Sequence, residues 1–424
     1  MIENGRNRLA VVVAPGSAAL PADRGAFSDV VRIERSPGGA TDFAEGLRQA
    51  CELAEANGCD WLVAPERDEA LRADTFALLA PALGAYDAIF GAVHVAGASE
   101  SIWRPSRLAF EAADRLPHAL LHWWVGRTAV MRTPVIRAVL GGQSSPSGSS
   151  GETAALDHLF RLFGNHRCIK FAQPLFDVAT EPALLSDNGR AFVLDRLERA
   201  PVFLPVHHGA ETYRLPYTGR NAGIEREQTR GQFFEAAELR VLADRLGEGR
   251  HIVDIGANTG NHTVYFAGPM RAASVLPFEP LPDIAAILSR TVAENGLDTV
   301  DLCHLCLGLS DAPGRARVIR SERGGLGASR LEAGSGGEIE VVRLDDVLTR
   351  APDFLKIDVE RMEMKVLAGA KTVIETARPL IFIEIANDNT AEFVDWTRRN
   401  HYRVERIFSD KGHSNYLIAP SGKN

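Results

Sequence analysis

The stretch His251-Ile-Val-Asp-Ile-Gly-Ala-Asn-Thr-Gly260 decides the fold of the second half of the chain. Its first five residues form a mainly apolar run that is typical of a buried strand. The small residues after Ile255 form a turn before Asn261–Ala267, where a helix can begin. In an open α/β sheet a nucleotide-like ligand binds in the crevice after such a strand, because small residues let the backbone approach it closely. This stretch therefore predicts a nucleotide-like ligand at the end of a parallel strand.

A second element of the same site follows along the chain. The run Ala273–Phe278 predicts another strand, and it ends in Glu279-Pro280, where a carboxylate suits the two hydroxyls of a ribose. A dinucleotide-binding oxidoreductase is the main alternative, but it normally has Gly-x-Gly-x-x-Gly at the turn, and here the third position of that pattern is Asn258. Asn258 and Asp254 suit the ammonium and carboxylate of a methionine moiety better than a pyrophosphate. S-adenosylmethionine (SAM) is therefore favoured over NAD.

Length and pattern indicate two α/β domains. At 424 residues the chain exceeds one ordinary domain of about 100–200 residues. Prolines interrupt its middle, so we place a first domain at 1–180, a linker with an N-terminal extension of the second domain at 181–229, and the second domain at 230–424. Alternating strands and helices in the second domain indicate a parallel sheet covered on both faces. Its expected elements are a helix at Phe233–Leu246, a strand at Ile252–Ile255, a helix at Ile284–Asn295, a strand at Phe354–Ile357, a helix at Met362–Thr376, a strand at Leu380–Ile385, and a hairpin of Tyr402–Phe408 with Asn415–Ala419.

From Gly231 onward the sequence resembles the FkbM family of methyltransferases. The motifs that carry the resemblance occur in order: Gly231-Gln-Phe-Phe-Glu235, Val253-Asp-Ile-Gly-Ala-Asn258, Phe278-Glu-Pro280, Leu344-Asp-Asp346, Leu355-Lys-Ile-Asp-Val-Glu360, Glu363, Gly369-Ala370, Arg378-Pro379 and Glu384. The resemblance implies a class I methyltransferase fold, which is a Rossmann-like sheet with an antiparallel C-terminal hairpin. It also implies methyl transfer to a hydroxyl oxygen, most often on a sugar or a glycosylated natural product. One position departs from the pattern, because Arg361 stands where the family usually has glycine.

The expected cofactor contacts lie on the glycine-rich turn, at the end of the second strand, and on elements that should pass nearby. Leu307 and Gly308 are included because the strand-like run Leu302–Leu307 should pass the adenine. The full set is Glu235, Asp254, Gly256, Ala257, Asn258, Gly260, Asn261, Glu279, Pro280, Leu307 and Gly308.

Candidate catalytic carboxylates gather after the strand expected at Phe354–Ile357. Asp358 should project at the carboxyl edge of the sheet, with Glu360 and Glu363 just beyond it and Glu384 at the end of the next strand. Such a group could take the proton of the acceptor hydroxyl, or bind Mg²⁺ or Mn²⁺ that lowers the pKa of this hydroxyl. The alternative is that Glu360 and Glu363 stabilise the N-terminus of the next helix. One further candidate base, which could equally be structural or a cofactor contact, is His262.

The first half resembles, in part, a family 2 glycosyltransferase with a GT-A fold. Leu9–Val13 predicts a strand, Thr41–Glu55 a helix, and Asp60–Ala64 a strand that runs into Glu66-Arg67-Asp68. In that family the strand ends in Asp-x-Asp, whose carboxylates bind the metal that holds a nucleotide-sugar diphosphate. The resemblance implies that Glu66 and Asp68 are metal ligands. Three interpretations of the first half stay open, namely an active glycosyltransferase, a degenerate domain that binds glycan, and an unrelated α/β domain. For Glu66 and Asp68, a merely solvated turn also stays open.

Bulk properties narrow the class of protein. The net charge of −8 gives no general attraction to nucleic acid or to anionic lipid. No apolar run approaches the roughly 20 residues that cross a bilayer, and the N-terminus lacks a secretory signal, so we expect a cytoplasmic protein. Cys303 and Cys306 fall on the strand-like run and should point to opposite faces, which argues against a redox or metal pair. The oligomeric state and the identity of the acceptor do not follow from the sequence.

The sequence thus favours a SAM-dependent O-methyltransferase that acts on a sugar or glycan-type acceptor, with the first domain supplying or recognising the glycan. Two alternatives remain at this stage. One is a bifunctional glycosyltransferase and methyltransferase that also uses a nucleotide-sugar. The other is a non-catalytic scaffold that binds SAM and glycan.

Overall fold

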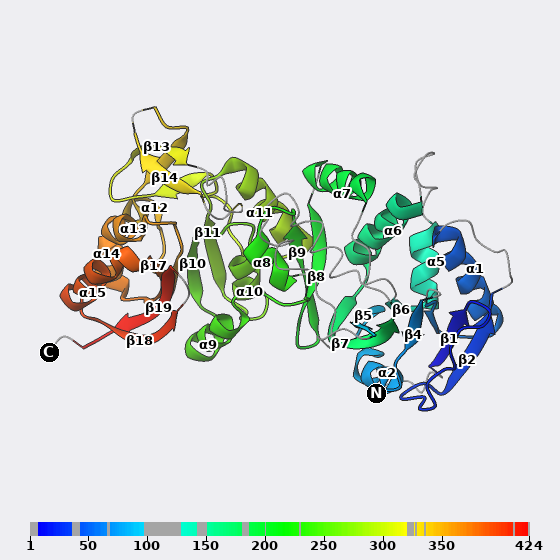
Figure 1. Cartoon of the computed structure of the whole chain (residues 1–424). Helices are drawn as coiled ribbons and strands as arrows, with labels where there is room; N and C mark the ends of the chain where they lie inside the picture. Colours follow the sequence, from blue (N-terminus) through cyan, green and yellow to red (C-terminus); the bar gives the residue numbers. More distant parts are fainter. Residues whose placement is uncertain are drawn as a thin grey trace. The chain divides into compact units, whose positions relative to one another are not determined.

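The computed structural model describes most of the chain, and the described residues form two compact units (Figure 1). Unit 1 comprises Met1–Thr212 and Tyr217–Gln232, and unit 2 comprises Tyr213–Pro216 and Phe233–Asn424. Each unit has its own sheet and its own hydrophobic core. The described residues are 7–35, 43–65, 68–96, 129–141, 151–179, 186–199, 201–228, 230–319, 326, 329–334, 336–409 and 412–422.

Unit 1 is built on a mixed sheet in the strand order β2-β1-β3-β6-β5-β7-β4. β1 is parallel to β2 and β3, β5 is parallel to β7, and β6 runs antiparallel between β3 and β5. The strands are β1 (Arg8–Val13), β2 (Asp29–Glu34), β3 (Trp61–Val63), β4 (Glu69–Leu71), β5 (Ala88–Val95), β6 (Ala129–Arg132) and β7 (Cys168–Val178), and the helices include α1 (Phe43–Ala56), α2 (Thr75–Leu79), α5 (Thr133–Gly141), α6 (Gly151–Asn165), α7 (Asp187–Arg199) and α8 (Ala222–Gln228).

Strand β1 shows why this sheet is covered on both faces. Its residues alternate between two cores, because side chains on a strand point to opposite faces in turn. Leu9, Val11 and Val13 pack with residues of β3 and α2, whereas Ala10 and Val12 pack with α1. A continuous apolar run is therefore what a central strand of this sheet requires. A separate two-stranded sheet is formed by β8 (Val202–His208) and β9 (Glu211–Tyr217).

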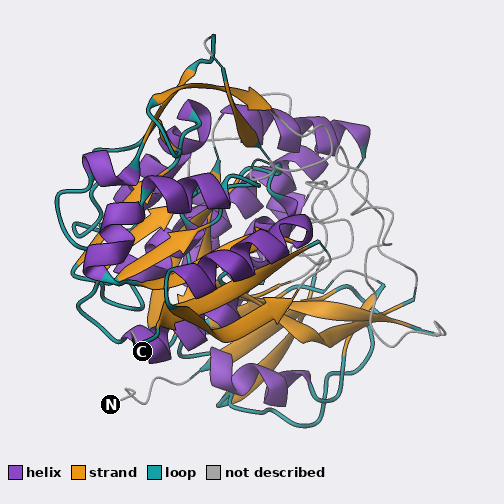
Figure 2. Cartoon of the chain, turned by 90° about the vertical axis from the view of Figure 1, so that its left-hand side faces the viewer, coloured by secondary structure: helices purple, strands orange, loops and turns teal. Residues whose placement is uncertain are grey.

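Unit 2 contains the parallel sheet that the sequence predicts. Its strand order is β11-β10-β16-β17-β19-β18, with parallel pairing from β11 to β17 and antiparallel pairing from β17 to β18. Figure 2, which turns the left-hand side of Figure 1 toward the viewer, shows helices lying along the strands. The strands of this sheet are β10 (His251–Ile255), β11 (Ser274–Phe278), β16 (Phe354–Ile357), β17 (Leu380–Ala386), β18 (Tyr402–Ser409) and β19 (His413–Pro420).

The remaining elements of unit 2 cover this sheet or extend from it. A second, smaller sheet has the order β12-β15-β13-β14. Its strands are β12 (Leu307–Leu309), β13 (Gly314–Ile319), β14 (Arg330–Ala333) and β15 (Ile339–Val342). The helices are α9 (Ala236–Leu246), α10 (Asn261–Ala267), α11 (Pro282–Glu294), α12 (Leu344–Val347), α13 (Glu363–Gly369), α14 (Lys371–Ala377) and α15 (Thr390–Arg399). Within the described ranges, every helix is too short or too polar to cross a bilayer.

The structure differs from the sequence prediction at Leu302–Cys306, which forms turns rather than a strand. The N–H of Leu305 donates to the carbonyl oxygen of Leu302 at 3.2 Å, and both leucines pack on the cluster that includes Leu288 of α11. Apolar residues three apart lie on one side of a turn, so the run satisfies its packing without a strand. Cys303 and Cys306 are exposed free cysteines on this turn, and the argument that a strand separates them was therefore wrong.

Two helices also have bounds that differ from those predicted from the sequence pattern. Helix α9 begins at Ala236 because Glu235 adopts a left-handed conformation with φ of 56°. The helix expected over Met362–Thr376 is divided at Ala370, where the backbone leaves helical geometry between α13 and α14. The C-terminal hairpin is confirmed, with β18 and β19 paired antiparallel.

Candidate active site

The glycine-rich turn after β10 is shaped by its protein neighbours. Gly256 has φ of +75°, and a β-carbon there would lie 1.7 Å from the carbonyl oxygen of Asp358. The N–H groups of Gly256 and Ala257 both donate to the carbonyl oxygen of Phe278, at 2.9 and 3.0 Å. Gly260 has φ of +101°, and a β-carbon there would lie 2.7 Å from Cδ1 of Leu288. The small residues therefore let this turn lie against both neighbouring strand ends and α11.

Glu279 is fixed at the end of β11. One carboxylate oxygen accepts the N–H of Asn258 and the other accepts the N–H of Leu281, each at 3.0 Å. Burial raises the pKa of Glu279 to about 7, although both N–H groups act in the opposite direction. Each oxygen keeps further capacity to accept a hydrogen bond, which is the chemistry that ribose hydroxyls need. The carboxylate oxygens of Glu279 thus fit the nucleoside part of SAM. Pro280 follows Glu279 directly in the chain.

Asn258 and Asn261 have different surroundings. Asn258 has φ of 51°, is partly exposed, and accepts the N–H of Thr259 on its Oδ1 at 2.8 Å. Asn261 is 2% exposed, and its amide exchanges two hydrogen bonds with the backbone of Phe234, at 3.0 and 3.1 Å. Asn261 therefore ties the segment before α9 to the start of α10, while Asn258 keeps its side chain on the turn where a cofactor would approach.

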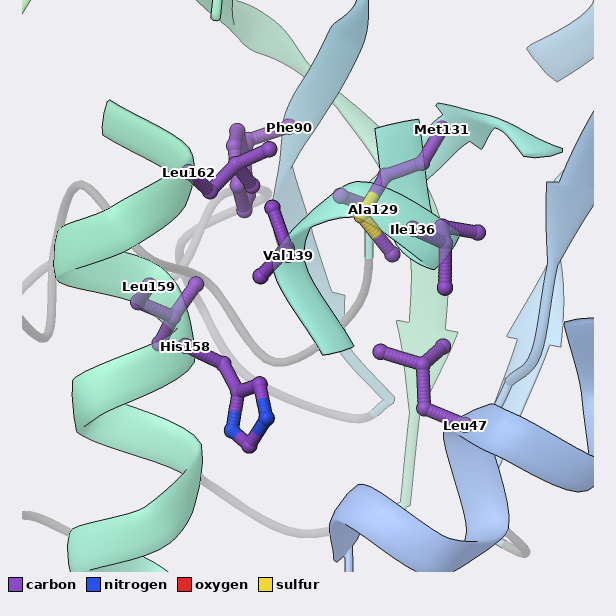
Figure 3. A pocket seen from close by; sticks show the side chains of 9 residues that line it. All are labelled: Leu47, Phe90, Ala129, Met131, Ile136, Val139, His158, Leu159 and Leu162. Carbon is purple, nitrogen blue, oxygen red and sulfur yellow. The ribbon is translucent and has the colours of Figure 1, made fainter. Parts of the chain in front are cut away.

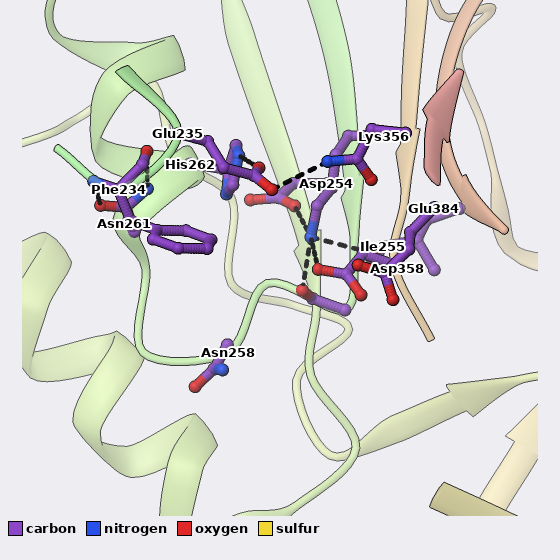
Figure 4. Close-up of polar contacts among 12 residues, drawn as sticks. Phe234, Glu235, Asp254, Ile255, Asn258, Asn261, His262, Lys356, Asp358 and Glu384 are labelled. Atoms are coloured by element: carbon purple, nitrogen blue, oxygen red, sulfur yellow. Dashed lines mark hydrogen bonds and ion pairs between the residues drawn. The ribbon is translucent and has the colours of Figure 1, made fainter. Parts of the chain in front are cut away.

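A buried lysine lies at the centre of the site (Figure 4). Nζ of Lys356 donates to the carbonyl oxygen of Gly256 at 2.7 Å, and it lies 3.4 Å from Oδ1 of Asp254 and 3.5 Å from Oδ2 of Asp358. Lys356 is 2% exposed and Asp254 is fully buried. Burial opposes the charge of the ammonium, but the carboxylates of Asp358, Asp254 and Glu235 outweigh it and raise the pKa of Lys356. The lysine is therefore a permanent cation among carboxylates.

Register explains why these residues meet. Asp254 of β10 is the direct cross-strand partner of Lys356 on β16, and Glu384 of β17 is the partner of Asn415 on β19. Side chains two residues apart on a strand share a face, so Asp358 follows Lys356 on this face. One face of the sheet thus presents a row of charged and polar groups near the carboxyl ends of β10, β16 and β17.

Glu235 joins this row from the start of α9. Its carboxylate lies 3.0 Å from Nε2 of His262 and accepts the amide N–H of Asn415 at 2.8 Å. Burial acts to raise the pKa of Glu235, but the hydrogen bond and charge of His262 and the charge of Lys356 hold it below its ordinary value. His262 is 6% exposed and its ring packs near Phe266. The structure therefore places His262 as a partner of Glu235.

The outer part of the row is acidic. Burial and the carboxylates of Asp358 and Glu363 raise the pKa of Glu360 to about 7. Burial and the carboxylates of Asp358 and Glu360 raise the pKa of Glu384 to about 9. Nε2 of His413 lies 3.2 Å from the carboxylate of Glu384. The charge of Asp358 acts on both Glu360 and Glu384, so these three carboxyl groups lie near one another, and their role in catalysis stays a prediction.

Glu363 and Arg361 have partners outside this acidic group, although the charge of Glu363 also acts on Glu360. The carboxylate of Glu363 accepts the N–H of Arg361 at 2.7 Å, and burial raises the pKa of Glu363. This contact links Glu363, the first residue of α13, to the turn before the helix, and the catalytic role of Glu363 stays a prediction. The guanidinium of Arg361 pairs with Asp388 at 2.8 Å, and its side chain is 58% exposed. The φ of +75° at Arg361 accounts for a preference for glycine at this position.

Leu307 and Gly308 belong to the smaller sheet. Gly308 on β12 pairs with Val341 on β15, and a β-carbon there would lie 2.6 Å from Cδ1 of Leu331. A side chain at this position would therefore require Leu331 and Val341 to shift. Their role in cofactor binding stays a prediction.

Of the two metal ligands expected in unit 1, the structure describes only Asp68. Glu66 lies outside the described residues, and Asp68 lies in the turn between β3 and β4. Across the described ranges, no group of three or more histidine, cysteine, aspartate or glutamate side chains is arranged to hold a metal ion. A small pocket of about 40 Å³ in unit 1 is lined by apolar side chains such as Phe90, Val139 and Leu162 (Figure 3). The pocket is also lined by His158, whose Nδ1 forms a hydrogen bond with the carbonyl oxygen of Ala154.

Sequence reasoning missed three members of the site: Lys356, His413 and Asn415. A signal for Lys356 was available, since a charged residue inside an apolar strand is rarely buried without partners. His413 and Asn415 lie on β19, and only the pairing of β19 with β17 brings them to Glu384 and Glu235. No local pattern in the sequence carries that information.

A family model and several known proteins match part of this chain. The model described as the methyltransferase FkbM domain matches residues 254–413. The chain is 29% identical over 172 residues to methyltransferase sdnD of Sordaria araneosa, covering 30% of this chain and 66% of that protein. It is 31% identical over 198 residues to the 31-O-demethyl-FK506 methyltransferase FkbM of Streptomyces tacrolimicus, covering 38% of this chain and 76% of that protein. A solved structure of methyltransferase FkbM from Methylobacillus flagellatus KT is 20% identical with a TM-score of 0.30, covering 40% of this chain and 43% of that chain.

Proposed function

The chain belongs to the FkbM methyltransferase family, and from this premise we propose that this SAM-dependent methyltransferase methylates a hydroxyl oxygen of a sugar or glycan-type acceptor. The FkbM relative supports the choice of oxygen, since its name specifies 31-O-demethyl-FK506 as the compound that it methylates. The sugar-type acceptor rests on the chemistry of the site.

The observation that carries the proposal is the group formed by Asp358, Glu384 and His413. Asp358 follows β16, Glu384 lies on the adjacent parallel strand β17, and His413 lies 3.2 Å from the carboxylate of Glu384. Carboxylates accept hydrogen bonds from hydroxyls, and neighbouring carboxylates suit the several hydroxyls of a sugar. Asp358 is the proposed base, because its side chain is 39% exposed and an acceptor hydroxyl can reach it.

In the proposed reaction the chain positions the acceptor and receives its proton. SAM supplies, when bound, a methyl group on a positively charged sulfur. Glu279 and the turn at Asn258 hold the nucleoside and methionine parts of SAM. Asp358 accepts the proton of the attacking hydroxyl, so that the oxygen forms a bond to the methyl carbon as the sulfur–methyl bond breaks. The products are a methyl ether, S-adenosylhomocysteine and the protonated carboxyl of Asp358.

The test uses SAM with an isotopically labelled methyl group and a panel of free and lipid-linked sugars, analysed by mass spectrometry. We expect a labelled product for at least one hydroxyl acceptor, and we expect Asp358→Asn to reduce turnover by at least about a hundredfold while SAM affinity persists. Glu375→Gln, an exposed carboxylate on α14, is the matched control and should keep full activity. Full activity in Asp358→Asn would remove this residue from the mechanism. Binding of SAM without turnover on any acceptor would favour the non-catalytic scaffold.

For unit 1 we propose a role in handling the glycan or a nucleotide-sugar. The support is the position of Asp68 in the turn that follows β3, a strand parallel to β1. Calorimetry with UDP-sugars and Mn²⁺ tests this proposal, and Asp68→Asn should weaken the binding. Heat of binding that does not depend on Mn²⁺ or on Asp68 would leave unit 1 without a glycosyltransferase-type site.

A further inference from the structure

The site contains a feature that methyl transfer alone does not explain, namely a buried cation that contacts both sides of the reaction. The shortest contact of Lys356 Nζ goes to the carbonyl oxygen of Gly256, at 2.7 Å. Its other contacts go to Asp254, to Asp358 and to the carbonyl oxygen of Ile255, at 3.4, 3.5 and 3.5 Å. Gly256 begins the cofactor turn, and Asp358 is the proposed base. The same ammonium group therefore touches the donor side and the acceptor side.

The backbone makes this connection short. The N–H of Asp358 donates to the carbonyl oxygen of Ile255 at 3.0 Å, and Gly256 lies against the carbonyl of Asp358 with no room for a β-carbon. Lys356 lies next to this junction, because β10 and β16 are paired in register at Asp254 and Lys356. The cofactor turn and the base are thus held by one side chain at the point where two strands end.

We propose that Lys356 is a positioning residue that couples the cofactor turn to the proton acceptor. It orients the carbonyl of Gly256, and it holds the carboxylate of Asp358 in one place. The second part rests on the proposed function, because it takes Asp358 as the base. The first part does not, since it concerns only the turn that receives SAM.

Lysine suits this task for a physical reason. Its ammonium group has three donors and can serve a carbonyl and two carboxylates at once. A cation within about 4–6 Å favours the charged form of a carboxylate. Without Lys356, the remaining groups around Asp358 are mostly acidic and would oppose its charge. These groups are Glu360 on its own loop, Glu363 at the start of α13 and Glu384 on β17, with Arg361 beside Glu360 and His413 on β19 beside Glu384, while Asp254 on β10 and Glu235 before α9 face Lys356.

Lys356→Met in the full chain tests the proposal with two measurements. We expect calorimetry to show SAM binding about tenfold more weakly or worse, because the carbonyl of Gly256 loses a charged donor. We expect the acidic limb of the kcat profile to move to higher pH by about one unit or more, because Asp358 loses its cation. Lys356→Arg keeps a cation at this place, and its acidic limb should stay where it is in the wild type.

A second variant guards against loss of folding. Lys356→Met leaves the fully buried Asp254 without its cation, and breaking such a pair strongly destabilises a protein. If that variant does not fold, the paired variant Asp254→Asn with Lys356→Met removes both charges and carries the same two measurements. A purely structural lysine would change the folded fraction without moving the acidic limb of the folded enzyme.

The outcomes separate the two proposals. A folded Lys356→Met, or the paired variant, with wild-type SAM affinity and an unmoved acidic limb would overturn the coupling. If the proposed function is wrong, the wild-type chain transfers methyl to no hydroxyl acceptor. SAM affinity is then the one measurement that tests the role of Lys356. In that case a loss of SAM affinity in Lys356→Met, but not in Asp358→Asn, supports the contact with the cofactor turn, and equal affinity in all three proteins overturns it.

Discussion

A β-carbon at Gly256 would lie 1.7 Å from the carbonyl oxygen of Asp358, so the cofactor turn and the proposed base are in direct backbone contact. The glycine at this position serves the junction of two strands as much as the approach of a ligand. It follows that the turn cannot shift without disturbing the loop that carries Asp358.

Gly256→Ala should therefore be more damaging than an alanine at another glycine with the same backbone conformation. Gly249 has φ of +74° with nothing within 4 Å of an added β-carbon, so Gly249→Ala measures the cost of the conformation alone, roughly 1–2 kcal/mol. We expect Gly256→Ala to cost about 1–3 kcal/mol more, since the clash is with backbone. Urea unfolding of the two variants measures the difference. Equal losses would mean that the junction is loose.

Arg361 is expected to carry backbone strain. Its φ is +75°, and its exposed ion pair with Asp388 is worth at most about 1 kcal/mol. Arg361→Gly relieves the strain and Arg361→Ala does not, while both remove the ion pair. We expect the glycine variant to be more stable than the alanine variant by about 0.5–1 kcal/mol, after the greater freedom of glycine in the unfolded chain is included. Thermal unfolding of the pair provides the comparison, and a more stable alanine variant would argue against strain.

Glu384 should make stability fall as the pH rises. Burial and the carboxylates of Asp358 and Glu360 raise its pKa from the ordinary 4.5 to about 9. Between these two values the folded chain binds more protons at this site than the unfolded chain, so raising the pH favours unfolding. Glu384→Gln cannot titrate, and we expect it to flatten the loss of stability between pH 6 and pH 8.5. Urea midpoints at both pH values test this, with Glu375→Gln as the control that keeps the wild-type slope.

SAM affinity should depend on pH through Glu279. Burial raises the pKa of this carboxyl to about 7, so at pH 6 it is mostly protonated and accepts hydrogen bonds less well. We expect SAM to bind more tightly at pH 8 than at pH 6, and Glu279→Gln to bind weakly with little change over this range. Calorimetry at the two pH values checks both statements. Tight, pH-independent binding in Glu279→Gln would exclude Glu279 from the cofactor site.

Local sequence patterns predicted part of the fold and part of the site. The apolar run at β10, the turn at Gly256 and the carboxylate that ends β11 follow from strand propensity and spacing, and the hairpin of β18 and β19 follows from alternation around a turn. They failed at Leu302–Cys306, because leucines three residues apart are equally suited to a turn that packs on α11.

By itself, the sequence determined that unit 2 has a parallel sheet with a cofactor turn after β10 and acidic residues after β16, because each of these depends on residues close together in the chain. Only the tertiary structure decided which charges face one another. Strand register brings Lys356 beside Asp254, and the antiparallel return of β19 brings Asn415 and His413 to Glu235 and Glu384. Register and strand order are set by packing over the whole sheet, and for that reason they cannot be read from any one segment.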